Sequence, residues 1–69
     1  MKIVLNGADR EVPETTTVAT LVRELDGRAG DGRGVAVAID AQVIPRSRWE
    51  AVELTEGQRV EILGAIQGG

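Results

Sequence analysis

Residues with catalytic side chains are scarce in this chain of 69 residues. It has no cysteine and no histidine. A disulfide framework, a thiolate zinc site and a cysteine nucleophile are therefore absent, as is the commonest general base. Ser47 is the one serine and has no histidine partner for a hydrolytic triad. These absences argue against a self-contained enzyme.

One reactive group remains at the end of the chain, where Gly68 and Gly69 follow a run with strand-like alternation. Most chains that end in glycine are simply frayed there. Because the other nucleophiles are excluded, the Gly69 carboxylate is the candidate reactive group. We expect residues 66–69 to form a flexible C-terminal tail that presents this carboxylate to a partner.

The composition limits the partners and the compartment. The net charge is -3, with acidic and basic residues mixed along the chain, whereas nucleic acid selects a basic face that often carries stacking aromatic residues. No apolar run approaches the roughly 20 residues that span a bilayer, and the N-terminus lacks the apolar region of a signal peptide. We therefore expect one soluble, cytoplasmic domain over residues 1–69, monomeric when free, that binds neither nucleic acid nor a membrane.

The first part of the chain predicts a β-hairpin followed by a helix. Apolar residues alternate along 1–5, and Asn6-Gly7 is the strongest short hairpin signal because both residues tolerate positive φ. Residues 8–12 then form the returning strand, which Pro13 ends. Candidate N-cap threonines at 15–17 precede an apolar stripe typical of a helix over 18–26. The stripe consists of Val18, Leu21, Val22 and Leu25.

The rest of the chain predicts a loop and further strands. Residues 27–34 are glycine-rich and follow a helix, whereas a phosphate-binding glycine loop follows a strand, so we expect a mobile surface loop. Arg46, Arg48 and Trp49 allow a nucleic-acid contact, but two solvated arginines around a core tryptophan explain the same residues. The remaining elements are strands over 35–39, 42–44 and 59–65, a turn at Asp40-Ala41 and a short helical turn over 46–49.

This order favours an α+β fold in which a mixed sheet of four to five strands packs on one main helix. A helix that returns the chain to the same sheet makes a right-handed crossover and a parallel strand pair. That topology is the ubiquitin-like β-grasp, although other small α+β sheets fit the same pattern. The predicted helix-facing residues are Ile3, Leu5, Val18, Leu21, Val22, Leu25, Val35, Val37, Ile39, Leu54, Val60 and Ile62.

The other face of the sheet is the candidate docking surface. Alternation puts Leu63 and Ala65 on the face opposite the core, with Val4 near Leu63 if the first and last strands are neighbours. Lys2 or Glu61 would tune the choice of partner. Isolated surface apolar residues are common, and that interpretation has equal weight. The candidate docking residues, with two from the tail, are Val4, Leu63, Ala65, Ile66 and Gln67.

Several segments together resemble one family, the sulfur-carrier proteins of thiamin biosynthesis (ThiS). The resemblance covers essentially the whole chain, and the Pro-Arg-Ser-x-Trp part is its most specific motif. Asp40-Ala41 departs from the Asn-Gly that the family often has at this turn. The segments that carry the resemblance are Asn6-Gly7, Val35-Ala36-Val37-Ala38, Ile44-Pro45-Arg46-Ser47-x-Trp49, Gly57-x-x-Val60-Glu61-Ile62 and Gly68-Gly69.

The resemblance implies a carrier on which partner enzymes act. An adenylating enzyme (E1-like, ThiF-type) would use ATP to convert the Gly69 carboxylate into an acyl-adenylate. A sulfur donor such as a cysteine desulfurase would then give a thiocarboxylate, and a thiazole synthase (ThiG-type) would take the sulfur. The chain itself would bind no cofactor and no metal. Three alternatives stay open: a carrier for molybdopterin or cysteine synthesis, a ubiquitin-like protein modifier, and a plain binding module.

Overall fold

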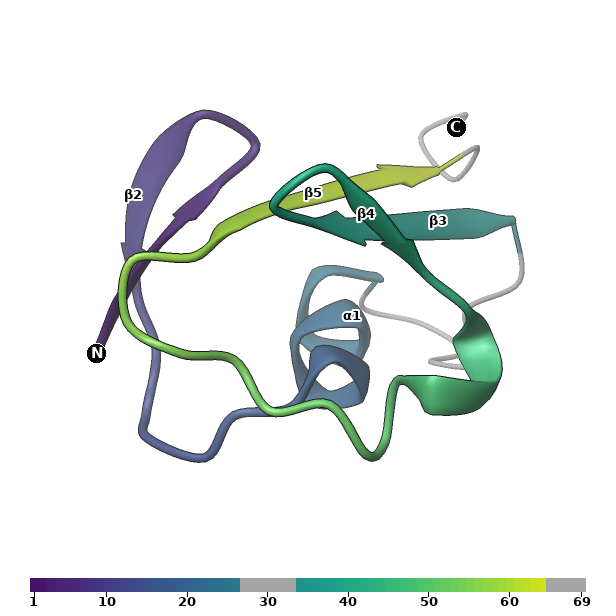
Figure 1. Cartoon of the computed structure of the whole chain (residues 1–69), viewed down its shortest axis with the longest axis horizontal. Coiled ribbons are helices and arrows are strands. Elements are labelled where there is room, and N and C mark those ends of the chain that lie inside the picture. The colour runs from purple at the N-terminus through teal and green to yellow at the C-terminus, as the bar shows by residue number, and fades with distance from the viewer. Residues whose placement is uncertain (27–33, 65–69) are drawn as a thin grey trace.

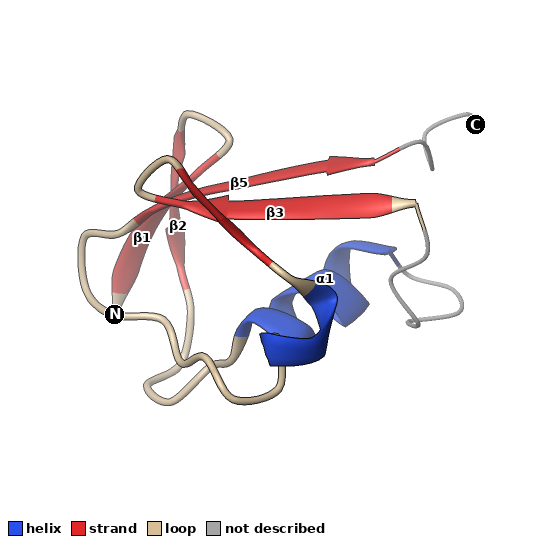
Figure 2. Cartoon of the chain, turned by 45° about the vertical axis from the view of Figure 1, so that its right-hand side comes forward, coloured by secondary structure: helices blue, strands red, loops and turns tan. Residues whose placement is uncertain are grey.

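The computed structural model describes residues 1–26 and 34–64, which form one sheet with an α-helix on one of its faces (Figures 1 and 2). The strand order is β2-β1-β5-β3-β4, with β1 and β5 parallel and the other neighbouring pairs antiparallel. The predicted mixed sheet on one helix is therefore confirmed. The elements are β1 (Lys2–Leu5), β2 (Ala8–Glu11), α1 (Val18–Asp26), β3 (Val35–Ile39), β4 (Gln42–Ile44), the 3-10 helix η1 (Arg46–Arg48) and β5 (Arg59–Gly64).

Both hairpins turn through two residues with positive φ. Asn6 and Gly7 have φ values of 50° and 86°, and Asp40 and Ala41 have 49° and 72°. Positive φ at both central residues matches the right-handed twist of the flanking strands. Glycine adopts this conformation without strain, whereas the Cβ of an L-residue crowds the following carbonyl oxygen. Ala41 therefore holds a strained conformation that Gly7 avoids in the equivalent turn.

The start of α1 confirms the predicted N-cap. The Thr17 hydroxyl accepts a hydrogen bond of 3.1 Å from the backbone N–H of Thr20, which has no partner within the helix. Thr17 also pairs with Glu53 in an isolated antiparallel bridge, so the cap is joined to the segment that leads to β5.

The helix has nine residues, and within the described part of the chain no helix is long and apolar enough to cross a membrane.

The core lies between α1 and the sheet, and most of its predicted members are confirmed. Val35 and Ile62 are half-buried at its edge. The prediction that Leu25 is part of the core is wrong, since this residue is 40% exposed. Leu25 lies one helical turn beyond the buried Leu21 and Val22. The period of an apolar stripe gives the side of the helix on which a residue lies, but it does not show how far along the helix the sheet covers that side. The buried apolar residues are Ile3, Leu5, Val12, Val18, Ala19, Leu21, Val22, Val37, Ile39, Trp49, Leu54 and Val60.

Trp49 packs into the core at the edge of the sheet formed by β4. Its side chain is only 5% exposed, and its indole N–H donates to the Ile44 carbonyl at 2.8 Å. The Trp49 carbonyl in turn accepts the N–H of Ala19 at 3.1 Å. Trp49 therefore joins β4 to α1 and ends the 3-10 turn that follows Pro45. The interpretation of Trp49 as a core tryptophan is therefore confirmed.

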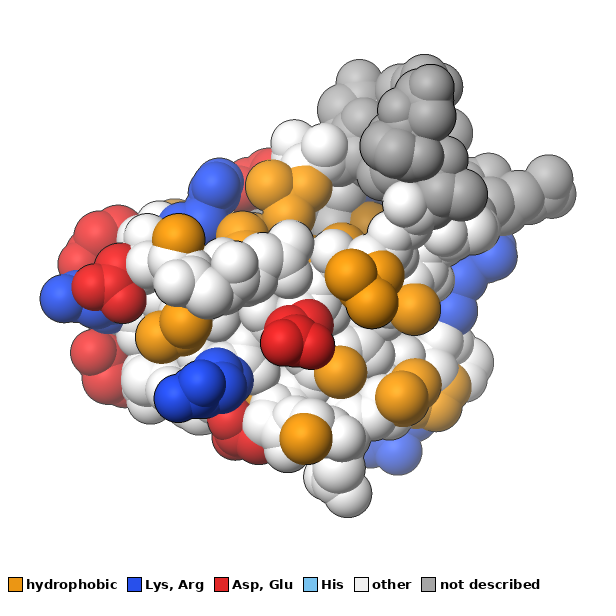
Figure 3. Space-filling view, turned by 90° about the horizontal axis from the view of Figure 1, so that it is seen from above, with side chains coloured by type: hydrophobic (Ala, Val, Ile, Leu, Met, Phe, Trp, Pro, Cys, Tyr) orange, Lys and Arg blue, Asp and Glu red, His pale blue; other side chains and the backbone are white. Residues whose placement is uncertain are grey.

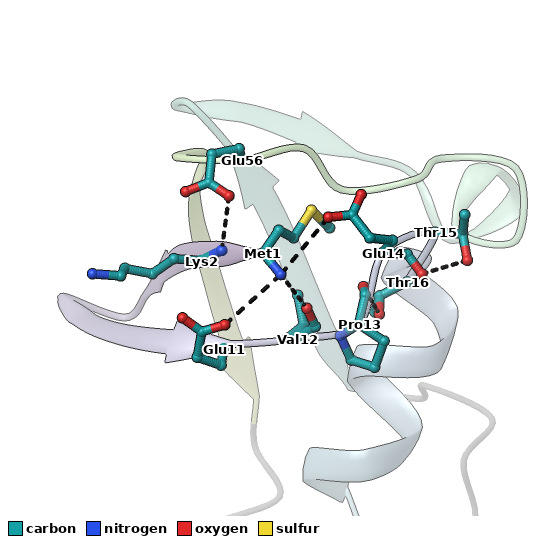
Figure 4. Close-up of polar contacts among 9 residues, drawn as sticks. All are labelled: Met1, Lys2, Glu11, Val12, Pro13, Glu14, Thr15, Thr16 and Glu56. Carbon is teal, nitrogen blue, oxygen red and sulfur yellow. Dashed lines mark hydrogen bonds and ion pairs between the residues drawn. The ribbon is translucent and has the colours of Figure 1, made fainter.

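Backbone contacts around Met1 and Lys2 join the first hairpin to the segment before β5 (Figure 4). The Met1 ammonium donates to the Val12 carbonyl at 2.8 Å and lies 3.8 Å from the Glu11 carboxylate. The Lys2 backbone N–H donates to the Glu56 carboxylate at 3.0 Å. The Lys2 carbonyl accepts the N–H of Gly57 at 2.7 Å. Val12 beside Met1 is buried, although the alternation pattern did not assign it to the core.

The two turns predict opposite effects of exchanging glycine and alanine. Ala41→Gly should raise the free energy of unfolding by about 0.5–1 kcal/mol because it removes backbone strain. Gly7→Ala should lower it by about 1–2 kcal/mol, and because no atom lies within 4 Å of the added Cβ, the cost comes from the backbone alone. Urea unfolding followed by circular dichroism measures both. A destabilised Ala41→Gly variant would contradict the strain at this turn.

Candidate functional site

The predicted reactive terminus is connected to the described structure through β5, the central strand of the sheet. Gly68 and Gly69 lie outside the described residues, as do the candidate docking residues Ala65, Ile66 and Gln67. The structure shows where the segment that contains them begins, since β5 ends at Gly64. The predicted strand over 59–65 is confirmed for its first six residues.

The strand β5 has one buried face and one open face. Val60 is buried and Ile62 half-buried against α1, whereas Glu61 and Leu63 point away from the helix. The predicted alternation along this strand is therefore confirmed. Leu63 is 65% exposed, a large fraction for a leucine in the central strand of a sheet.

Four apolar side chains lie beside Glu61 on this open face, along β5 and towards β3 and β4 (Figure 3). The register places Ala36 opposite Leu63 and Ala38 opposite Glu61, and Val43 of β4 follows Ala38 in the same row. Val43 is 74% exposed. We call Ala36, Ala38, Val43, Leu63 and Glu61 the open-face patch. The sequence analysis missed Val43 as a candidate, although its place between Gln42 and Ile44 in a strand gives it the orientation opposite to Ile44.

Val4 lies on the same side of the sheet but outside the open-face patch. The strands β1 and β5 are neighbours, which meets the condition set by the sequence analysis. However, the register pairs Val4 with Arg59, four positions from Leu63, which corresponds to about 13 Å along a strand. The expected proximity of Val4 and Leu63 is therefore wrong, because the alternation pattern gives the face of a residue but not its register.

The two charged docking candidates, Lys2 and Glu61, lie in different parts of the sheet. Lys2 lies at the far end of β1, and its ammonium is 3.9 Å from the Asp9 carboxylate on β2. Glu61 lies within the open-face patch and is exposed. Of these two residues, Glu61 has the position to influence what binds beside the start of the C-terminal segment.

The described residues form an exposed apolar patch and no enclosed pocket. In this part of the chain, no ligand-sized pocket is found and no three His, Cys, Asp or Glu residues are grouped to hold a metal. An apolar patch around one carboxylate, on the strand that runs into the C-terminal segment, suits contact with another macromolecule.

The sheet order with one helix on one face defines a ubiquitin-like β-grasp protein. The comparisons with known proteins give the family: the ThiS family model matches residues 3–69. The chain belongs to the ThiS family. The family resemblance found in the sequence is therefore confirmed.

Two relatives by sequence are similar to the whole chain. The sulfur carrier protein ThiS of Escherichia coli (strain K12) is 30% identical over 69 residues, which cover all of both chains. A thiazole synthase of Paramagnetospirillum magneticum is 36% identical over 69 residues. The matched region covers the whole of this chain but only about a fifth (20%) of that synthase.

Solved structures of a thiamine biosynthesis protein (ThiS) from Geobacter metallireducens share the fold. Its crystal structure aligns over all of both chains, with a TM-score of 0.77 and 27% identity. Its solution structure aligns over 91% of this chain and 81% of that one, with a TM-score of 0.74 and 26% identity.

The two faces of β5 predict different tolerance to substitution. Leu63→Ser should change the free energy of unfolding by less than about 0.5 kcal/mol because the side chain is mostly in water. Val60→Ala should cost roughly 2 kcal/mol, since it removes buried methyl groups and leaves a cavity. Chemical unfolding of both variants tests this. Equal losses would mean that Leu63 is packed rather than exposed.

Proposed function

We propose that this protein is a sulfur carrier of thiamin biosynthesis that transports sulfur as a thiocarboxylate at Gly69. The observation that carries the proposal is the match to the Escherichia coli sulfur carrier, which covers both chains from end to end. The family match also runs to Gly69. The absence of cysteine and histidine from the sequence supports a carrier rather than an enzyme.

The proposed chemistry uses the Gly69 carboxylate as the nucleophile. One of its oxygens attacks the α-phosphorus of ATP bound to an adenylating enzyme, pyrophosphate leaves, and an acyl-adenylate forms. Activating the acyl carbon in this way gives it a good leaving group. A persulfide sulfur from a donor such as a cysteine desulfurase then attacks the acyl carbon and displaces AMP, which gives an acyl disulfide. A thiol reduces its S–S bond, which releases the thiocarboxylate, whereas free sulfide gives the thiocarboxylate directly. ATP is a substrate of the partner in this scheme, and the carrier itself binds no cofactor.

Glycines at 68 and 69 suit this role for a physical reason. Without Cβ atoms they pass through a narrow channel and adopt backbone angles that other residues avoid. The same freedom makes ordering them on binding costly. Affinity for the partner must therefore come mainly from contacts made elsewhere on the domain.

The open-face patch is the proposed source of that affinity. Leu63 provides exposed apolar surface on the strand that leads to Gly69, and Val43 provides more on β4, two strands away. Glu61 among them requires a cation from the partner, because a carboxylate buried without one is costly. A two-fold dimer through this face would bring two Glu61 carboxylates together, which favours a different protein as the occupant and agrees with a monomeric free carrier.

A thiazole synthase is the proposed acceptor of the sulfur. In the Paramagnetospirillum magneticum relative, a segment matching this whole chain belongs to the same polypeptide as a thiazole synthase. Covalent linkage raises the effective concentration of two modules that must meet, which supports the same pairing for this chain. The adenylating enzyme, the sulfur donor and a location in the cytoplasm are further parts of the proposal.

The first test measures the terminus directly. After incubation with ATP, a ThiF-type adenylating enzyme and a sulfide source, intact-mass analysis should show one carboxylate oxygen replaced by sulfur. A variant extended by one residue beyond Gly69 should fold normally and gain no sulfur, because its reactive carboxylate is displaced from the partner's active site. Sulfur gained by the extended variant would contradict the proposal, and stable lysine conjugates would instead indicate a protein modifier.

The second test addresses docking. Leu63→Asp should weaken binding to a ThiG-type thiazole synthase at least about tenfold, as expected for an apolar anchor at the centre of an interface. Leu25→Asp is the matched control, because Leu25 is also partly exposed but belongs to α1 on the other face of the sheet. It should change the dissociation constant less than about twofold. Titration calorimetry measures both, and equal effects would exclude the open-face patch as the docking surface.

A further inference from the structure

The parallel ladder between β1 and β5 stops before β5 does. Residue pairing ends at Leu5 and Val60, whereas β5 continues to Gly64. Two backbone bonds mark the ladder: the N–H of Val4 donates to the Gln58 carbonyl and the N–H of Asn6 to the Val60 carbonyl, both at 2.9 Å. The regular spacing makes Ile62 the next residue of β5 to need a partner on this side.

The Asn6 side chain supplies that partner. Its Oδ1 accepts the N–H of Ile62 at 2.9 Å, and its Nδ2 donates to the carbonyl of Ile62 at 3.2 Å. A carboxamide has the same donor and acceptor as a peptide unit. The side chain therefore acts as one further residue of β1, although the main chain has already turned away at Gly7.

The turn alone does not require this side chain. Asn6 has a φ of 50°, which glycine adopts readily. The turn geometry therefore accounts for a residue that tolerates positive φ, but not for two bonds to a residue 56 positions away in sequence. These bonds act on β5, immediately before the C-terminal segment.

We propose that Asn6 is a positioning residue for the carrier terminus. By holding Ile62 on the side of β5 that faces β1, it fixes the end of β5 from which the C-terminal segment starts. Without it, the last residues of β5 keep their bonds to β3 but gain freedom on the other side. That freedom is lost again on docking, so it weakens the productive complex. This inference rests on the proposed function of Gly69.

A matched control exists in the other hairpin turn. Asp40 has a φ of 49°, and its Oδ1 accepts the N–H of Arg59, the first residue of β5, at 3.1 Å. Asn6→Gly and Asp40→Gly therefore both keep a residue that tolerates positive φ and remove side-chain bonding to β5. The two substitutions differ in which end of β5 they release.

The first measurement uses the isolated protein. Amide hydrogen exchange followed by NMR should show Ile62 exchanging at least about tenfold faster in Asn6→Gly, as expected when two ordinary hydrogen bonds are lost. Asp40→Gly should accelerate Arg59 and leave Ile62 within about twofold. Unchanged exchange at Ile62 in Asn6→Gly would overturn the inference whatever the partner enzymes do.

The second measurement follows transfer at a temperature where both variants remain folded. With a ThiF-type adenylating enzyme and ATP, Asn6→Gly should raise the KM for the carrier about three- to tenfold and leave kcat within twofold, because binding rather than chemistry is affected. Asp40→Gly should leave both constants within about twofold. Equal effects of the two variants, or no effect of Asn6→Gly, would overturn the positioning role. A wild-type chain that is never adenylated would instead refute the proposed function, while the exchange result still decides what Asn6 does to β5.

Discussion

The placement of β5 between β1 and β3 is the constraint on which the rest of the structure depends. Pairing with β1 brings together the first and last strands, and pairing with β3 adds the second hairpin on the other side. The parallel pair requires a crossover, which α1 and the segments around it provide. Once β5 is in place, α1 covers one face of the sheet and the C-terminal segment starts at the end of the central strand (Figure 2).

The two faces of β5 divide folding from recognition. Val60 on one face is buried with Ile3 and Leu21, and this packing stabilises the domain. Leu63 and Glu61 on the other face contribute little to the core and are free to meet a partner. A strand with period two allows both tasks in six residues, because successive side chains point to opposite faces. A domain of this size can thereby keep an exposed apolar patch on the same strand from which its C-terminal segment starts.

Much of this could be predicted from local pattern. Alternation and the Asn6-Gly7 turn predicted the first hairpin, and the period of the apolar stripe predicted α1 with its bounds. The resemblance to the ThiS family rested on short motifs and is confirmed by the family match over residues 3–69. Leu25 was wrongly assigned to the core, and the buried Val12 was missed. Periodicity describes a single helix or strand, whereas burial depends on which other element covers it.

What the sequence by itself determined is the set of elements and the face of the sheet or helix on which most residues lie. Strand register and contacts between distant residues were decided only by the tertiary structure. Register separates Val4 from Leu63 and brings Val43 into the row of Glu61. It also places the Asn6 amide against Ile62. The physical reason is that a period-two pattern is unchanged when a strand slides by two residues, so the pairing is selected by packing across the whole sheet.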